Sequence, residues 1–439
     1  MMTGGEEILE EDDVLTMPHA PPVFHLLAKP TGAVCNLDCQ YCFFLSKEQL
    51  YPGDRFRMAD ELLERYIRQL LEAHRVPEVT VAWQGGEPTL MGLEFFRRSI
   101  ELAERYRRPR QRVLYTIQTN GVLVDQEWAK FFKQHGFLVG LSVDGPRDAH
   151  DRYRVDKGGS GTFDRVLRGY AHLREHDVDV NVLCSVHAAN QDRPVDVYRF
   201  LRDDLGARFI QFIPIVERTT EQLLSLANLK GSAKNQKRPL YTQAGSRVTE
   251  RSVGAQAFGA FLIAVFEEWF QADVGEVFVQ MFDTALANWH GEPPGLCVFS
   301  ETCGTALALE HNGDLYSCDH YVEPHFRLGN ITETPLGELA GSERQRAFGL
   351  AKRDSLPKYC QSCDVRFACH GGCPRNRFIR TPDGDDGLNY LCAGYKAFFE
   401  HVDGPMRLMS ALLRQGRAPA EAPRIWRSGR ARRPSGAQV

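Results

Sequence analysis

Short apolar runs alternate with longer amphipathic segments through the first half of the chain. Runs typical of β-strands lie at residues 23–29, 79–83, 113–117, 138–143, 178–186 and 209–213. Between them, apolar residues recur with the period of an α-helix over 58–74, 93–106, 125–135, 163–176 and 195–205. Strands that alternate with helices of this length usually form parallel β/α units. The pattern therefore predicts six such units, fewer than the eight of a closed barrel.

The pattern changes in the second half. The alternating pattern fails over residues 217–253, and the polar stretch 230–239, which has no period, predicts a long loop or linker. A helix rich in Phe and Ala is expected over 257–270, and His311-Asn-Gly-Asp314 has the composition of a hairpin turn. The expected segments are an acidic disordered leader (1–22), a partial barrel (23–255), a helical linker (256–296), a cysteine-rich domain (297–405) and an Arg-rich disordered tail (414–439).

Composition excludes several classes of protein. The 439 residues carry a formal net charge of −4 and are 43% hydrophobic, as in a globular protein with a substantial core. This charge gives no sign that nucleic acid or an anionic membrane is a partner. No apolar run could span a bilayer, and the acidic start does not resemble a secretory signal, so we expect a cytoplasmic location. Twelve cysteines in such a chain favour metal binding or catalysis over disulfides.

Three of the cysteines follow the first predicted strand, in Cys35-Asn-Leu-Asp-Cys39-Gln-Tyr-Cys42. Thiolates are the usual ligands of iron–sulfur clusters, which normally take four. Three thiolates on a four-iron cluster would leave one iron with an open position, the feature that separates reactive metal sites from structural ones. From this motif alone, a zinc loop that lacks one ligand, or three unrelated buried thiols, remains an alternative.

Polar and glycine-rich motifs follow the next three predicted strands. These are Trp83-Gln-Gly-Gly-Glu-Pro88, Thr119-Asn-Gly121 and Ser142-Val-Asp-Gly-Pro146. Each could be only a tight turn. However, the working residues of parallel β/α folds lie at the carboxyl ends of strands, where the cysteine loop also lies. The motifs therefore indicate a binding site at this edge, where Gly85 and Gly86 would let the backbone come close to a ligand.

The second half holds eight further cysteines, enough for two sites of four. They are Cys297, Cys303, Cys318, Cys360, Cys363, Cys369, Cys373 and Cys392. Cys360-Gln-Ser-Cys363 alone would suit a zinc ribbon, and spacing does not distinguish zinc from iron–sulfur. The last cysteine, Cys184, lies in an apolar strand and is expected to be a small core residue.

The cysteine loop resembles that of the radical S-adenosylmethionine (SAM) enzymes. The second half resembles one subfamily, the anaerobic sulfatase-maturating enzymes. The motifs are Asp273-Val-Gly, Cys297-Val-Phe-Ser-Glu-Thr-Cys303-Gly, Glu310-His-Asn-Gly-Asp-Leu-Tyr-Ser-Cys318-Asp319-His320 and Gly387-Leu-Asn-Tyr-Leu-Cys392-Ala-Gly-Tyr-Lys. The resemblance covers about residues 24–401 and implies an α/β fold, a partial (β/α)6 radical SAM barrel followed by a SPASM domain. The implied cofactors are three [4Fe-4S] clusters and SAM.

The resemblance also implies a role for particular residues. The reactive cluster would bind to Cys35, Cys39 and Cys42, one auxiliary cluster to Cys297, Cys303, Cys318 and Cys373, and the other to Cys360, Cys363, Cys369 and Cys392. SAM contacts would fall on Tyr41, Gly86, Ser142, Arg154 and Ile215. The aspartate directly after the third ligand of the first auxiliary cluster, Asp319, would be the catalytic base.

The activity implied by the resemblance is oxidation of a Cys or Ser side chain in a sulfatase active-site motif to Cα-formylglycine. A 5′-deoxyadenosyl radical would abstract the hydrogen. The partners would be the sulfatase polypeptide and an electron donor such as flavodoxin or ferredoxin, with no nucleic acid and no membrane. One alternative is a SPASM-type maturase that forms thioether or carbon–carbon links in another ribosomally made peptide. The other is a cysteine-rich zinc protein that acts as a scaffold.

Overall fold

The computed structural model describes residues 23–229 and 238–431, so the predicted leader and the end of the predicted tail lie outside it. Within these residues, ten strands form one sheet in the order β12-β11-β10-β1-β2-β3-β4-β5-β6-β9. No helix of this part of the chain is long and apolar enough to cross a bilayer.

Six parallel strands follow one another across the sheet, as the alternating pattern predicts. They are β1 (His25–Lys29), β2 (Glu78–Trp83), β3 (Arg112–Thr119), β4 (Phe137–Ser142), β5 (Asp179–Val186) and β6 (Phe209–Pro214). The helices between them are α1 (Asp60–Ala73), α2 (Leu93–Tyr106), α3 (Gln126–Gln134), α4 (Arg147–Tyr153), α5 (Phe163–Glu175) and α6 (Pro194–Arg199). The predicted partial (β/α)6 barrel is confirmed.

Local sequence explains where these helices begin and which face they bury. In α1, Leu63, Tyr66 and Leu70 lie on one face and are fully buried against the sheet. Helix α3 begins after Asp125, whose carboxylate accepts hydrogen bonds from the first backbone N–H groups of the helix. Burial of these apolar faces on the sheet stabilises the helices more than their intrinsic propensity does.

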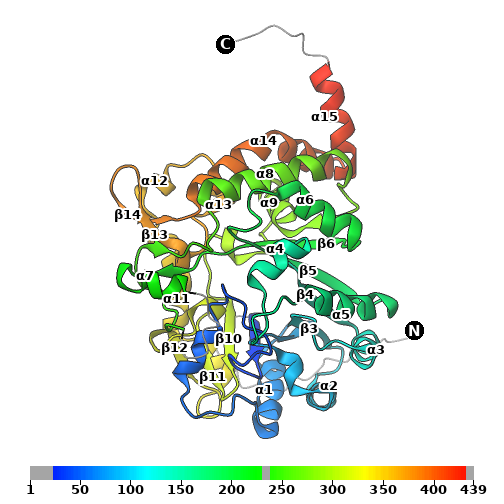
Figure 1. Cartoon of the computed structure of the whole chain (residues 1–439), viewed down its shortest axis with the longest axis vertical. Helices are drawn as coiled ribbons and strands as arrows, with labels where there is room; N and C mark the ends of the chain where they lie inside the picture. Colours follow the sequence, from blue (N-terminus) through cyan, green and yellow to red (C-terminus); the bar gives the residue numbers. More distant parts are fainter. Residues whose placement is uncertain (1–22, 230–237, 432–439) are drawn as a thin grey trace, which may run out of the picture.

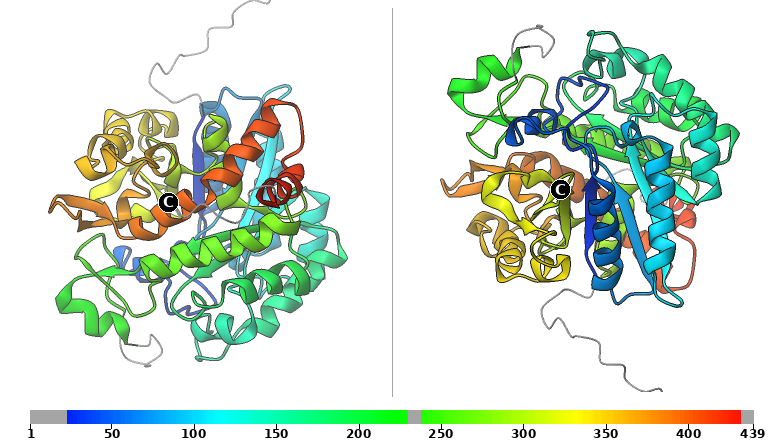
Figure 2. Two further views of the ribbon diagram at one scale, coloured as in Figure 1. Left: turned by 90° about the horizontal axis from the view of Figure 1, so that it is seen from above. Right: turned by 90° about the horizontal axis from the view of Figure 1, so that it is seen from below.

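The cysteine-rich half extends the barrel sheet. Strand β10 (Ala306–Glu310) runs parallel to β1, with Glu310 opposite Lys29. Strands β11 (Asp314–Tyr316) and β12 (Arg327–Asn330) continue antiparallel beyond it, and β10 and β11 confirm the predicted hairpin turn. Figure 1 shows β10 and β11 beside the first β/α unit, and Figure 2 shows the yellow and orange C-terminal elements on one side of the barrel. The division of the chain at 255 and 297 stays a prediction.

The other half of the core lies between β5, β6 and three long helices, α8 (Ala255–Ala272), α9 (Gln280–His290) and α14 (Cys392–Arg414). Helices α8 and α14 lie side by side (Figure 1). A Cβ atom on Gly259 would come within 2.6 Å of the Gly394 Cα atom, so only glycine permits this close crossing. The smaller elements are β9 (Phe278–Val279), α10 (Leu336–Ala340), α11 (Glu343–Asp354), α12 (Lys358–Gln361), α13 (Arg366–Cys369), β13 (Arg377–Arg380) and β14 (Asp386–Asn389).

The region 217–253, where the alternating pattern fails, holds short regular elements on either side of the predicted loop at 230–239. Strands β7 (Arg218–Thr219) and β8 (Arg247–Val248) pair antiparallel, and α7 (Glu221–Asn228) lies between them in the sequence. The Thr220 side chain accepts a hydrogen bond from the first turn of α7. Such a cap and a two-residue strand pair leave no periodic pattern in the sequence. Residues 230–237 lie outside the described part.

The prediction of a disordered tail over 414–439 is wrong as far as residue 431. Helix α14 ends at Arg414, and a short turn leads into α15 (Ala422–Ala431). Ala422 is fully buried, and the Trp426 ring lies 6.4 Å from that of Phe270 on α8, measured between centroids. The composition of the tail concealed an apolar face, whose residues recur at helical spacing between exposed arginines.

Candidate active site

The cysteine loop packs directly on the loop that follows β2. The Gly86 N–H donates to the Gly32 carbonyl at 2.7 Å, and the Glu87 N–H donates to the Val34 carbonyl at 2.9 Å. A Cβ atom on Gly86 would lie 1.9 Å from the Val34 carbonyl oxygen. The sequence suggested that glycine here admits a ligand, but the approach of Val34 already requires it.

Glu87, which the sequence analysis treated as part of a turn motif, is a buried anchor. Its carboxylate accepts hydrogen bonds from Thr89, from the Thr119 hydroxyl at 2.8 Å and from the Asn120 N–H at 2.8 Å. Burial raises the pKa of Glu87 although these donors favour its charged form. The Asn120 amide in turn donates to the Asn36 side chain at 2.7 Å. Glu87 thus fixes the loops after β1, β2 and β3 to one another.

Two of the predicted SAM contacts meet at one buried carboxylate. The Tyr41 hydroxyl donates to Asp144 Oδ2 at 2.5 Å, and Arg154 Nε donates to the same oxygen at 2.8 Å. Asp144 is fully buried, and Ser185 N–H donates to its other oxygen at 2.9 Å. Burial opposes ionisation, but Arg154 and His187 hold the pKa of Asp144 well below its usual range. The result is a fixed, charge-balanced cluster at the ends of β4 and β5.

The remaining predicted SAM contacts lie at the same carboxyl edge of the sheet. Ser142, the last residue of β4, accepts a hydrogen bond from Gln118 Nε2 at 3.0 Å. Ile215 follows β6, and its N–H donates to the Val186 carbonyl at 2.9 Å. The structure therefore brings the predicted residues to one edge, and their contact with SAM stays a prediction.

The thiols of the cysteine loop lie close enough to influence one another. Burial, together with the charge of the Cys42 thiol, raises the pKa of Cys35 and raises that of Cys39 to about 12. The Leu37 N–H points at Cys35 Sγ, with a nitrogen–sulfur distance of 3.3 Å. Thiols that are buried close together do not ionise easily, because each thiolate would repel the others. A cationic metal centre would remove this repulsion by binding all of them.

The eight thiols of the second half form two groups in space. One comprises Cys297, Cys303, Cys318 and Cys373, and the other Cys360, Cys363, Cys369 and Cys392. Burial, together with thiols of the same group, raises the pKa of Cys303 and that of Cys392 to about 11. This grouping matches the crossed assignment that the resemblance implies, whereas spacing would have grouped Cys360 to Cys373. Ligation itself stays a prediction.

Buried cations accompany the auxiliary thiols. Lys352 is almost fully buried, and its ammonium donates to the backbone carbonyls of Cys297 and Val298. Arg377 donates to the carbonyls of Lys352 at 2.6 Å and His370 at 2.8 Å. These cations hold the cysteine-bearing loops and place positive charge where thiolate ligands would need it.

Among the described residues, no group of three or more His, Cys, Asp or Glu side chains is arranged to hold a single metal ion. A four-iron cluster has a different requirement, because each cysteine binds a separate iron. One group of three thiols and two of four therefore fit iron–sulfur clusters by their number and chemistry.

Asp319 forms an ion pair with Lys29, the last residue of β1. The Lys29 side chain is buried, lies 3.9 Å from the centre of the Phe44 ring, and donates to Gln84 Oε1 at 3.3 Å. Burial opposes ionisation of Asp319, but the Lys29 charge holds its pKa below the usual value. A carboxylate kept ionised directly after Cys318 can act as a proton acceptor.

A strap formed by residues 238–244 crosses the cysteine loop. Arg238 donates from its guanidinium to the Cys39 carbonyl at 2.9 Å. The Tyr241 N–H donates to the Ser46 hydroxyl at 2.9 Å. This strap, which begins at the end of the predicted loop 230–239, thus contacts the candidate active site directly.

Sequence reasoning missed Lys29, Glu87, Asp144 and Arg238 as individual functional residues. A lysine at the end of an otherwise apolar strand was a visible signal for Lys29. The turn motifs contained Glu87 and Asp144, but their partners lie on other strands. Nothing in the local sequence marks Arg238, which is about 200 residues from its partner Cys39.

Two family models match the chain. The model of the radical SAM superfamily matches residues 30–201, and the model of the SPASM iron–sulfur cluster-binding domain matches residues 297–364. These ranges contain the cysteine loop and one part of the auxiliary thiols.

Two curated relatives are similar over almost their whole length. The serine-type anaerobic sulfatase-maturating enzyme of Bacteroides thetaiotaomicron is 42% identical over 94% of this chain and 97% of its own. The cysteine-type anaerobic sulfatase-maturating enzyme of Clostridium perfringens is 33% identical over 87% of this chain and 96% of its own.

A solved structure, native anSMEcpe with bound AdoMet and Cp18Cys peptide, has the same fold. It matches with a TM-score of 0.75 and 31% sequence identity, over 89% of this chain and 99% of that one. A protein with this fold therefore binds both AdoMet, which is SAM, and a peptide.

Proposed function

Because the chain belongs to the anaerobic sulfatase-maturating enzymes of the radical SAM superfamily, we propose that it oxidises a Cys or Ser side chain in a sulfatase active-site motif to Cα-formylglycine. The observation that carries this proposal is the Lys29–Asp319 ion pair. It places an ionised carboxylate directly after Cys318, a predicted ligand of one auxiliary cluster. The same carboxylate lies next to the loop that carries the predicted ligands of the reactive cluster.

Three [4Fe-4S] clusters and SAM are the proposed cofactors. The grouping of the thiols supports Cys35, Cys39 and Cys42 as ligands of the reactive cluster, and the two auxiliary groups as ligands of the others. When bound, these groups supply the hydrogen-abstracting radical and an exit for the surplus electron.

The residues around SAM have distinct proposed roles. Tyr41 and Arg154 would present a surface to SAM whose geometry is fixed by their shared bonds to Asp144. Ser142 and Ile215 would line the same side from the ends of their strands. Gly86 would offer its backbone while its lack of a side chain lets the cysteine loop approach.

Asp319 would accept the proton of the substrate's thiol or hydroxyl as the side chain is oxidised. Lys29 holds this carboxylate ionised and, through Gln84 and Phe44, in one place relative to the cysteine loop. A general base needs both properties, the correct protonation state and a position within hydrogen-bond reach of the proton.

The proposed partner is a sulfatase polypeptide, and an electron donor such as flavodoxin or ferredoxin is needed to start each cycle. Relatives are named for both serine-type and cysteine-type activity, so we propose both side chains as substrates. The comparisons favour this enzyme over a zinc scaffold.

The test uses anaerobically reconstituted enzyme, SAM, a reductant and two sulfatase-motif peptides, one with Cys and one with Ser at the target position. We expect an aldehyde in the product, detected by mass and by reaction with a hydrazide. A peptide that instead gains a thioether or carbon–carbon link would support the alternative maturase. SAM cleavage without any change in either peptide would refute the proposed function.

The role of Asp319 is tested with Asp319→Asn. Formylglycine formation should fall by about a hundredfold or more, the usual scale of an acid–base group, while iron content and SAM cleavage persist. Asp364→Asn is the matched control, because Asp364 also directly follows a predicted ligand but is exposed. If Asp319→Asn loses iron and its intact fraction turns over normally, the aspartate supports the cluster and is not the base.

A further inference from the structure

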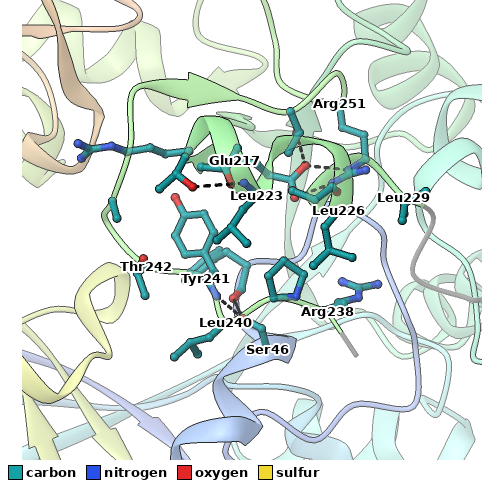
Figure 3. Close-up of a pocket in the computed structure, with 18 of the residues that line it drawn as sticks. Ser46, Glu217, Leu223, Leu226, Leu229, Arg238, Leu240, Tyr241, Thr242 and Arg251 are labelled. Atoms are coloured by element: carbon teal, nitrogen blue, oxygen red, sulfur yellow. Dashed lines mark hydrogen bonds and ion pairs between the residues drawn. The ribbon is translucent and has the colours of Figure 1, made fainter. Parts of the chain in front are cut away.

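A cavity of about 80 Å³ lies between helix α7 and the strap, beside the cysteine loop. Figure 3 shows Leu223 and Leu226 of α7 pointing toward Tyr241 and Leu240 of the strap. The cavity has several times the roughly 10–15 Å³ that one buried water requires. It therefore has room for more than a single water, as a bound side chain would need.

Most of the charged groups of the cavity wall are already in ion pairs. Glu217 forms an ion pair with Arg251 at 2.8 Å, and the two lie together at one side of the cavity (Figure 3). Arg238 directs its guanidinium at Asp38 and at the backbone of the cysteine loop. Arg218 donates to the Gly245 carbonyl. Because Glu217, Arg238 and Arg251 are already in ion pairs, most of the charge in the wall is neutralised, and an apolar side chain can be buried beside it.

The apolar part of the wall is exposed in the present structure. Leu223 and Leu226 of α7 are 39% and 37% exposed, and Leu229, which directly follows the helix, is 52% exposed, although all three line the cavity. The Tyr241 ring faces them from the strap (Figure 3), and Pro239 also lines the cavity. A ligand that buried these leucines would gain the free energy of removing apolar surface from water.

The cavity is continuous with the candidate active site. Cys42 and Phe43 of the cysteine loop form part of its wall, and the Phe43 and Tyr241 rings lie 5.7 Å apart between centroids. A chain bound at the reactive cluster could therefore place a neighbouring side chain here without leaving the surface of the protein.

We propose that this cavity binds an apolar side chain of the polypeptide substrate, at a position flanking the residue that is oxidised. The proposal rests on the proposed function, because it assumes a polypeptide substrate at the cysteine loop. It gives α7 and the strap the role of substrate-recognition elements.

The test measures binding as well as activity. A fluorescently labelled sulfatase-motif peptide is titrated into anaerobic holoenzyme without reductant, and its anisotropy gives the dissociation constant. Leu226→Asp should weaken binding by about tenfold or more, since every tenfold corresponds to only 1.4 kcal/mol and a buried leucine contributes more. The KM for peptide should rise similarly, with SAM cleavage in the absence of peptide unchanged.

Leu413→Asp is the matched control, because Leu413 is 36% exposed on α14 and Leu226 is 37% exposed on α7. Leu226→Ala is a second variant. Because alanine favours the helical conformation, weaker peptide binding by this variant cannot be attributed to unfolding of α7. A series of peptides in which each apolar flanking side chain is replaced by Ala identifies the occupant. The peptide replacement that weakens binding to the wild-type enzyme most should weaken binding to Leu226→Ala only slightly, because the two side chains would contact each other.

Unchanged dissociation constant and KM in folded Leu226→Asp would overturn the cavity proposal, as would an equal loss in Leu413→Asp. Either result leaves the proposed function intact if wild type still converts the peptide. If wild type converts neither the Cys nor the Ser peptide, the proposed function fails on its own evidence.

Discussion

Replacing Gly86 by Ala separates two reasons for a glycine at the candidate SAM site. The added Cβ would lie 1.9 Å from the Val34 carbonyl oxygen and 2.4 Å from its carbon. Carbon–oxygen contacts are normally about 3.3 Å or longer, so the two loops would have to separate by roughly 1.4 Å. A backbone carbonyl cannot rotate away as a side chain can. We therefore expect Gly86→Ala to displace the cysteine loop even when SAM is absent.

The cost follows from the bonds that hold the loops together. Separation breaks the Gly86–Gly32 and Glu87–Val34 backbone hydrogen bonds, of 2.7 and 2.9 Å. Each contributes about 1 kcal/mol net, and a buried group left unpaired costs about 1–3 kcal/mol. The free energy of unfolding should therefore fall by about 2–4 kcal/mol.

Iron analysis and thermal unfolding of anaerobically reconstituted protein provide the assay. Wild type should hold roughly twelve irons, and Gly86→Ala should lose about a third of them, together with SAM cleavage. Gly254→Ala is the control, because its φ is −68° and its added Cβ would meet its nearest atom at 3.5 Å, an ordinary contact. If Gly86→Ala retains all iron and the wild-type melting temperature and loses only SAM affinity, the steric reasoning is refuted.

Three further predictions concern stability and ligand assignment. Burial opposes protonation of His311, but Glu310 and Asp54 raise its pKa above the usual value of about 6.5. The protonated side chain should therefore stabilise the fold at lower pH, and this stabilisation should disappear as the pH rises through the raised pKa. A His311→Gln variant should flatten that part of the melting-temperature profile, and an unchanged profile would contradict the assignment. Truncation after Arg414 should lower the melting temperature because it removes the buried face of α15, while iron content stays at the wild-type level; an unchanged melting temperature would show that this packing contributes little. Cys184→Ala should cost about 1 kcal/mol or somewhat more of stability and no iron, because Cys184 is fully buried in the apolar core; a loss of iron would show that it is a ligand.

Local patterns were sufficient to predict the barrel because its elements depend on short-range periodicity. The helix over Leu93–Tyr106 has the predicted bounds, and the hairpin at His311–Gly313 forms where its turn residues occur. Both signals are contained in fewer than twenty residues. Helix α15 was missed for the opposite reason, since averaging over an Arg-rich segment concealed three apolar residues at helical spacing.

Motif and spacing also determined the type of chemistry. Three cysteines after the first strand and eight in the second half indicated thiolate-bound metal, and the resemblance identified the family. Spacing could not have divided the eight thiols, because Cys373 lies four residues from Cys369 in the sequence but belongs with Cys297 in space. Folding of the chain brings distant cysteines together, and sequence separation carries little information about that.

The tertiary structure alone decided which polar residues become anchors. Glu87 and Asp144 were visible as turn residues, but a carboxylate becomes an anchor only when donors from other strands reach it. The same holds for Lys29, which pairs with Asp319 because β10 places the second half of the chain beside β1. Ion pairs and hydrogen bonds act over a few ångströms, whereas sequence patterns report on neighbours along the chain. The sequence by itself therefore determined the elements of the barrel and indicated thiolate chemistry, and the parallel pairing of β1 with β10 brings Asp319 of the second half to Lys29 of the first.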